Sequence, residues 1–155
     1  MILFLKDSIL LSSSFLGLFR FIFLSNITFE INKFATYKSF NKISERNIEK
    51  IGDKPFIFYA LSLEPEFSVQ GRSKEFNDQK TIIKQIAINL PSGCELVIKE
   101  HSDIGRRDID FYKEILLLPN VRMAHPSIRG VDLVKKASAV ATLAGTVSFE
   151  ATMMG

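Results

Sequence analysis

The second half of the chain alternates short apolar runs with segments whose apolar residues recur every three or four positions. The apolar runs are typical of strands buried on both faces, and they occupy residues 56–61, 95–99, 121–124 and 138–141. The segments with helical spacing occupy residues 78–90, 106–117 and 131–136, and a last one opens at Thr146. Strands that alternate with helices predict an α/β fold built on a doubly wound parallel sheet.

The first half of the chain has a different pattern. Residues 1–24 are strongly apolar, but their longest charge-free run, 8–19, is shorter than the roughly 20 residues of a membrane span. Three interpretations stay open: a helix packed against another domain, which we favour, a helix lying on a membrane surface, and a span or signal peptide. Residues 27–31 alternate apolar and polar side chains and predict a short strand, whereas residues 37–51 carry a loose helical stripe.

A sharp break separates these two patterns. Residues 52–55 read GDKP, a turn-forming sequence that ends the helical stripe. We therefore predict an apolar helix and linker over residues 1–53 and one α/β domain over residues 54–155. The last helical pattern reaches Gly155, where a helix cap would fall and another strand would follow. We expect the chain to be a truncated part of a longer protein whose amino-terminal half is missing.

Composition narrows the classes of function. The 155 residues carry a net charge of +3 with basic and acidic residues interleaved, which argues against nucleic acid as a partner. The single cysteine, Cys94, excludes an internal disulfide and a multi-cysteine zinc site and favours a reducing, cytoplasmic location. The two histidines, His101 and His125, lack a third ligand at a suitable spacing, so we expect no metal.

The loops that follow the strands are the candidate site. Because the carboxyl ends of parallel strands meet at one edge of a sheet, one rim should hold residues 62–76, 100–105, 125–130 and 143–146. In the last of these loops Gly145 turns the chain into a helix at Thr146, and the N–H groups of such a helix start can bind a phosphate. Glu150, one turn later, could accept hydrogen bonds from the diol of a ribose. The alternatives are close packing for Gly145 and a solvent-exposed side chain for Glu150.

Charged residues at the other strand ends add to this site. Lys99 and His101 leave the second strand and could neutralise phosphate oxygens or a sugar acid, or be a solvated side chain and a helix cap. His125 ends the third strand and could act similarly, although His-Pro is also an ordinary turn. Glu66, in the loop after the first strand, could be a general base or one residue of a polar loop.

Three of these segments, taken in order, resemble motifs of the capsule polysaccharide biosynthesis proteins, bacterial glycosyltransferases that build surface polysaccharides. The segments are LEPE at residues 63–66, KEH at 99–101 and GTVSFE at 145–150, within a resemblance that spans residues 54–155. The chain departs from the family pattern at three positions, where the family has glutamine, proline and often glycine: Glu64, Ser102 and Ser148.

The resemblance implies a GT-B-like architecture of two Rossmann-like halves, of which residues 54–155 would bind the donor. It implies transfer of a sugar from a CMP- or UDP-linked nucleotide sugar to a growing glycan or glycolipid acceptor, with no metal or other cofactor. It assigns catalysis to Glu66 and His101, and donor binding to Lys99, Gly145, Thr146 and Glu150. The phosphate would lie at Gly145 and Thr146, and the ribose at Glu150.

Two other functions stay open at this point. A non-catalytic remnant or assembly subunit of a capsule synthesis and export complex is favoured by the apolar amino-terminal segment and the expected truncation. A nucleotide-sugar epimerase would use a related double-Rossmann fold without an acceptor. For the transferase we expect a cytoplasmic location, with peripheral association at the inner face of the cytoplasmic membrane as a further expectation.

Overall fold

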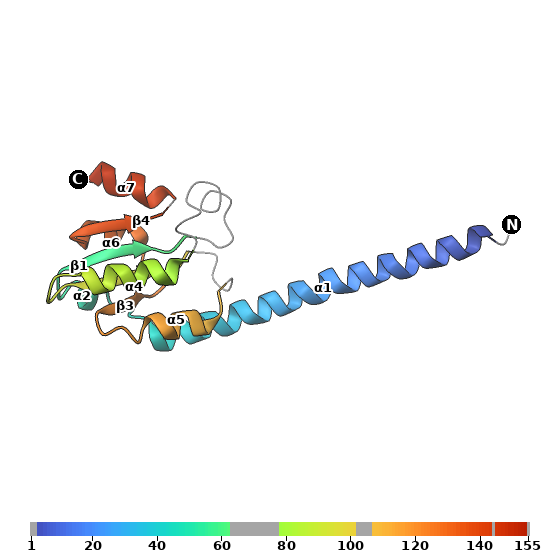
Figure 1. Ribbon diagram of the computed structural model, residues 1–155, viewed down its shortest axis with the longest axis horizontal. Helices are drawn as coiled ribbons and strands as arrows, with labels where there is room; N and C mark the ends of the chain where they lie inside the picture. Colours follow the sequence, from blue (N-terminus) through green and yellow to red (C-terminus); the bar gives the residue numbers. More distant parts are fainter. Residues whose placement is uncertain (1–2, 63–77, 102–106, 144, 155) are drawn as a thin grey trace.

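The computed structural model describes residues 3–62, 78–101, 107–143 and 145–154. Within them, four strands form one all-parallel sheet in the order β3-β2-β1-β4 (Figure 1). The strands are β1 (Phe56–Ala60), β2 (Glu95–Lys99), β3 (Val121–Ala124) and β4 (Ala139–Thr142). The predicted α/β fold, its four strands and their parallel arrangement are therefore confirmed.

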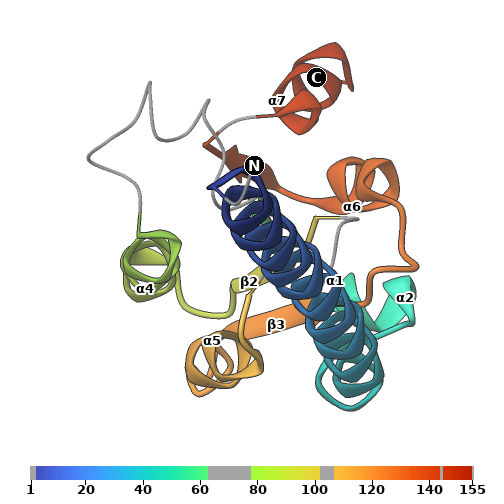
Figure 2. The same ribbon diagram turned by 90° about the vertical axis from the view of Figure 1, so that its right-hand side faces the viewer.

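Helices cover both faces of this sheet. The described residues form the helices α1 (Leu3–Ile43), α2 (Ile48–Ile51), α4 (Gln79–Asn89), α5 (Ile109–Ile115), α6 (Gly130–Lys136) and α7 (Thr146–Met154). Figure 2 shows α4 and α5 on one side of the sheet and α2, α6 and α7 on the other. This arrangement is consistent with the predicted doubly wound pattern.

Side-chain caps set the starts of α4 and α5. Asp78 accepts a hydrogen bond from the Lys80 N–H at 3.0 Å, so α4 begins where the sequence predicts it. Asp108 accepts one from the Asp110 N–H at 3.1 Å, and α5 begins at Ile109 rather than at the predicted residue 106. The predicted start was too early because Arg107 and Asp108 carry no apolar side chain that could mark it, and the cap at Asp108 alone fixes where α5 begins.

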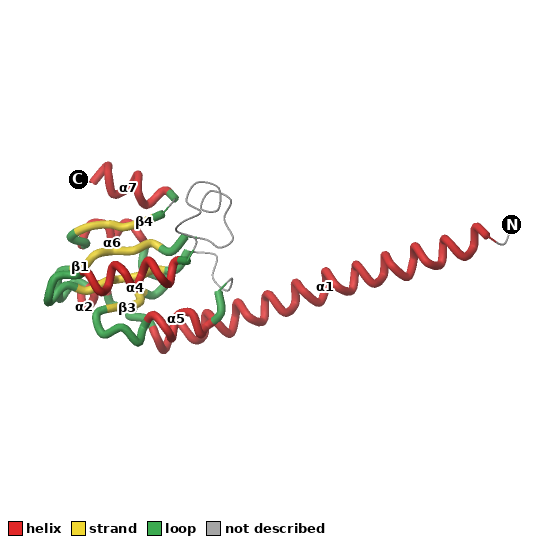
Figure 3. The backbone as a smooth tube through the Cα atoms, in the orientation of Figure 1, coloured by secondary structure: helices red, strands yellow, loops and turns green. Residues whose placement is uncertain are grey.

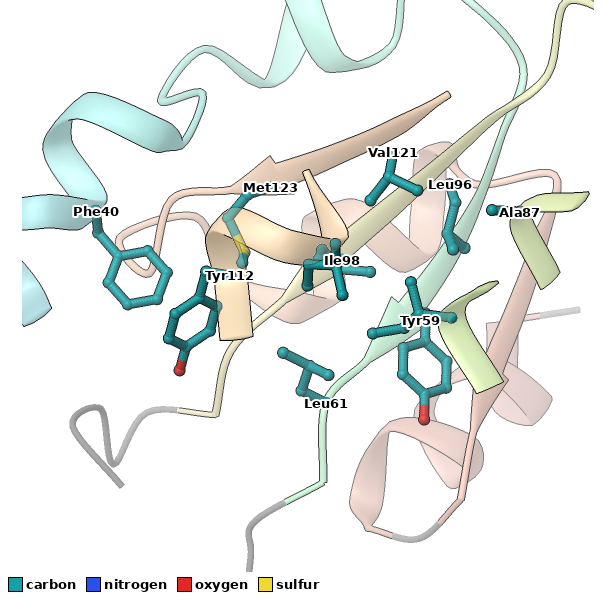
Figure 4. Close-up of a cluster of buried hydrophobic side chains, with 11 residues drawn as sticks. Phe40, Tyr59, Leu61, Ala87, Leu96, Ile98, Tyr112, Val121 and Met123 are labelled. Atoms are coloured by element: carbon teal, nitrogen blue, oxygen red, sulfur yellow. The ribbon is translucent and has the colours of Figure 1, made fainter. Parts of the chain in front are cut away.

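Two apolar cores lie on opposite faces of the sheet, because successive strand residues point to opposite sides. Leu96 and Ile98 of β2 enter the core shared with α4 and α5, which Figure 4 shows, whereas Val97 enters the core beneath α6. Both faces of β2 are thus buried, as expected for an inner strand of a parallel sheet.

The amino-terminal segment is one long helix. α1 spans 41 residues and extends away from the sheet (Figures 1 and 3). The strand predicted at residues 27–31 is therefore wrong. Ile27 and Ile31 also stand one helical turn apart, and no glycine or proline interrupts the helix around them, so the helical period prevails. Among the described residues, no helix combines the length and hydropathy that crossing a membrane requires.

The end of α1 and the following linker join the sheet. Phe40 is fully buried, and its ring packs edge-to-face on Tyr112 of α5 with the ring centroids 4.9 Å apart. Beyond the helix, Glu45 pairs with the edge of β3: its N–H donates to the Met123 carbonyl oxygen at 2.9 Å. Ile51 of α2 is buried in the second core. The boundary between residues 53 and 54 stays a prediction, but residues before it contribute to both cores.

Candidate functional site: a crevice at the strand-order switch

The order of the strands singles out one place on the sheet. From β1 the chain winds outward through β2 and β3, and it then returns to place β4 on the other side of β1. In open α/β sheets, ligands bind beyond the carboxyl ends of the strands at the point where the winding direction reverses. In this chain that point lies between β1 and β4.

A crevice of about 360 Å³ lies there, and we call it the switch-point crevice. Its apolar walls come from β1 and the residue after it, from the start of α6 and from α7: Phe58, Ala60, Leu61, Val131 and Val147. Its charged or titratable side chains come from the end of β2, the loop before α6 and α7: Lys99, Glu100, His101, Arg129 and Glu150. Apolar walls with a few convergent polar groups are typical of small-molecule sites.

The structure places three of the predicted site residues together. Lys99, His101 and Glu150 all line the switch-point crevice, although Glu150 lies about fifty residues after the other two. Gly145 and Thr146 do not line it, but they begin α7, whose Val147 and Glu150 do. Glu66 lies outside the described residues.

The turn at Gly145 requires glycine for its backbone. Gly145 has a φ of +103°, in the left-handed region that other residues rarely adopt, and no atom lies within 4 Å of where its Cβ would be. Close packing of the helix on the sheet therefore does not explain this glycine. The Ser148 hydroxyl donates to the Gly145 carbonyl oxygen at 2.9 Å across the first turn of α7.

Lys99 brings a half-buried positive charge to the crevice. Its Nζ donates to the carbonyl oxygen of Glu100 at 3.3 Å. Burial lowers the pKa of the Lys99 ammonium from its ordinary value, and the nearby Glu100 carboxylate opposes part of this shift. An anion bound in the crevice would replace the water that the ammonium has lost, so the charge favours an anionic ligand.

Arg129 is a crevice residue that the sequence reasoning missed. It lies in the predicted rim loop 125–130, directly before the glycine that begins α6, and this position could have identified it. Its guanidinium donates to both carboxylate oxygens of Asp132 at 2.8 Å, from Nε and from Nη2. The pair is exposed, so Arg129 adds positive charge to the crevice that Asp132 partly compensates.

His125, in contrast, belongs to the turn after β3 and is not among the residues that line the crevice. Its Nδ1 accepts the Ser127 N–H at 3.1 Å, and its Nε2 lies 3.1 Å from the Asn41 side-chain oxygen and 3.3 Å from Arg46 Nη2. Burial first, and then the charges of Arg46 and Lys99, lower the pKa of His125. The His-Pro turn is therefore the better of the two sequence interpretations for this residue.

The described residues hold no group of three or more His, Cys, Asp and Glu side chains arranged to bind a metal ion. Comparison with protein-family models, with curated proteins and with solved structures finds no match for this chain. The assignment of a function therefore depends on the geometry of the crevice and on the sequence motifs that reach it.

Proposed function

We propose that this chain is the donor-binding part of a GT-B-type glycosyltransferase of capsule or other surface polysaccharide biosynthesis. The observation that carries the proposal is the meeting of two sequence motifs in one crevice. The KEH segment contributes Lys99 and His101, and the GTVSFE segment contributes Glu150. Both motifs belong to the resemblance to the capsule polysaccharide biosynthesis proteins, and the crevice lies where Rossmann-like folds bind nucleotides.

The residues of the crevice fit the parts of a nucleotide sugar. Lys99 offers positive charge to phosphate oxygens, and the apolar walls formed by Phe58, Val131 and Val147 offer contact to a base or sugar ring. The Glu150 carboxylate can accept two hydrogen bonds from a ribose diol. Its partly buried position in the crevice supports this role over that of a fully solvated side chain.

Glycosyl transfer would use the same charges. When the bond between the anomeric carbon and the phosphate oxygen breaks, negative charge grows on the departing nucleotide phosphate. Lys99 and the N–H groups that begin α7 would stabilise that charge without a metal ion. His101 is exposed at the crevice, where it could balance charge or move a proton, and Glu66 would face the sugar or the acceptor hydroxyl as the base. The acceptor would be a glycan or glycolipid.

One observation favours a second candidate, an assembly subunit of a capsule synthesis and export complex. The side chains of Ile27, Ile31 and Phe34 form an exposed apolar stripe along α1, on which Phe34 is 71% exposed. Such a stripe suits a protein partner or a membrane surface. A cytoplasmic protein attached peripherally to the inner face of the membrane would be compatible with both candidates.

Calorimetric titration with CMP and UDP tests the donor-binding proposal. We expect weak binding by the full-length chain and a loss of about tenfold or more in Lys99→Ala and in Glu150→Gln, each of which removes one proposed contact. Lys135→Ala, which removes an exposed lysine of α6 that does not line the crevice, is the matched control and should bind like the wild type. Absence of binding by the wild type, or equal losses in the control, would contradict the proposal.

A further inference from the structure

A buried carboxylate lies directly behind the crevice. Glu100 is 3% exposed, and each of its oxygens accepts more than one hydrogen bond. Oε1 accepts from the His101 backbone N–H at 2.7 Å and from Arg107 Nη1 at 2.8 Å. Oε2 accepts from Arg107 Nη1 at 2.9 Å and from the Tyr112 hydroxyl. Burial and the charge of Glu100 raise the pKa of Tyr112, so this hydroxyl stays protonated and remains a donor.

The same network reaches the end of β1. Arg107 Nη2 donates to the carbonyl oxygen of Ser62, which also accepts from Gln79 Nε2 at 3.0 Å. The Ser62 N–H in turn donates to Gln79 Oε1 at 2.9 Å. All of these side chains are buried. The Arg107 guanidinium thus joins the segments that follow β1 and β2 at the crevice.

One peptide unit connects this network to the proposed ligand contacts. The N–H of the peptide between Glu100 and His101 donates to the Glu100 carboxylate, and its carbonyl oxygen accepts from Lys99 Nζ at 3.3 Å. Fixing this peptide therefore fixes both the direction of the Lys99 ammonium and the point from which the His101 side chain leaves the backbone.

We infer that Glu100, held by Arg107 and Tyr112, is a positioning residue that sets the geometry of Lys99 and His101 in the switch-point crevice. Glu100 acts through its neighbours, because its carboxylate is fully engaged by protein donors. The inference depends on the proposed function only in treating nucleotide as the ligand of the crevice. A network that served stability alone would instead leave the crevice unchanged in any variant that still folds.

The chain offers a matched control at the other end of the same strand. Glu95 begins β2, is also buried, and pairs with Arg122 at 3.1 Å and Lys54 at 2.9 Å. Glu95 and Glu100 are thus two paired carboxylates separated by the length of β2, and only Glu100 lines the crevice. Glu95→Gln tests what the loss of a paired carboxylate does to the domain, whereas Glu100→Gln tests what it does to the crevice.

The first measurement follows the His101 amide directly. The sequence has two histidines, so ¹⁵N-histidine labelling of the full-length chain in a mild non-ionic detergent yields two backbone amide signals. His125, whose N–H donates to the Glu45 carbonyl oxygen at 2.9 Å, is the internal reference. In Tyr112→Phe, which removes one hydroxyl and should keep the fold, we expect the His101 signal to shift and its hydrogen exchange to accelerate at least about threefold. The His125 signal should not move.

The second measurement compares nucleotide binding in variants that remain folded by circular dichroism. We expect Tyr112→Phe and Glu100→Gln to weaken CMP or UDP binding by about tenfold, and Glu95→Gln to bind like the wild type. An unchanged His101 amide in Tyr112→Phe overturns the positioning role, as does equal weakening by Glu95→Gln. If the wild type binds neither nucleotide, the proposed function fails, while the His101 amide still decides whether Glu100 positions the crevice.

Discussion

Replacing Phe40 by alanine should remove a large part of the domain's free energy of unfolding, although Phe40 belongs to the amino-terminal helix. Its side chain is 0% exposed and contributes to the same core as Tyr59, Ile98 and Tyr112. Truncation of a buried phenylalanine to alanine costs about 3–5 kcal/mol, which includes the cavity left behind. The edge-to-face contact with Tyr112 adds to the loss and places Phe40 toward the upper end of that range.

Urea denaturation followed by circular dichroism measures this cost. With a slope of about 2 kcal/mol per molar urea, a loss of about 4 kcal/mol lowers the midpoint by about 2 M. Phe34→Ala is the matched control, because it removes the same side chain from the same helix at a position that is 71% exposed. We expect that control to change the unfolding free energy by less than about 0.5 kcal/mol.

The comparison between the two variants decides how the end of α1 is attached. If Phe40→Ala costs no more than Phe34→Ala, the last turns of α1 do not belong to the core of the sheet domain. Since a domain marginally stable by about 5–15 kcal/mol cannot lose a core contact of this size unnoticed, a small effect would refute the packing described above.

Three further outcomes follow from the structure. Gly145→Val should weaken CMP and UDP binding measured by calorimetry, because its φ of +103° strains any β-branched residue at the start of α7; binding equal to wild type would contradict the role of this turn. The apolar amino-terminal segment, in which Leu18, Phe23 and Leu24 are exposed, should make the chain aggregate or cosediment with anionic liposomes, and deletion of residues 1–25 should restore solubility; a deletion that unfolds the rest would show that this segment belongs to the core. Because burial lowers the pKa of His125, the unfolded chain binds a proton below about pH 6.5 more readily than the folded chain does. The urea midpoint should therefore decrease as the pH is lowered from about 7 to about 5. The fall should be smaller in His125→Gln, and an identical fall would assign the pH dependence to other groups.

The elements of the sheet domain could be predicted because its strands are buried on both faces. A run such as FIFYA leaves no polar face, so its length and its flanking turns decide the assignment without knowledge of the fold. The alternation at residues 27–31 misled because five residues also fit one helical turn. This segment is helical because it continues the helix formed by the apolar residues on either side. The helical pattern can be recognised only over the whole 41-residue helix.

The candidate site could be predicted only in outline. The rule that ligands bind at the carboxyl ends of strands selected the end of β2 and the loop before α6, whose residues line the crevice, but the sequence does not state which loops are neighbours. That depends on the strand order, which places β4 beside β1 and so brings Glu150 close to Lys99. Arg129 lies in a loop that the same rule selects, but only the strand order shows that this loop shares a crevice with α7.

The local sequence pattern does not predict that Glu100 is buried while the next residue, His101, is exposed. The two residues follow β2 directly, and either could have faced the crevice as a solvated side chain. Glu100 is buried because Arg107 and Tyr112, which come later in the chain, supply donors at the place where it enters the protein. Paired carboxylates of this kind can therefore be found only after the helices have been placed.

The free-energy cost of burying the Glu100–Arg107 ion pair argues against a role in stability alone. Removing two charges from water costs several kcal/mol per ion, and apolar replacements of buried ion pairs are often as stable as the pair itself. A need for stability alone would thus not favour Glu100 and Arg107 over two apolar residues. Apolar side chains, however, have no directed bonds with which to hold one particular peptide plane. Arg107 Nη1, which donates to both oxygens of Glu100, and the His101 N–H, which donates to one of them, supply that direction, and they do so at the edge of the crevice that Lys99 lines.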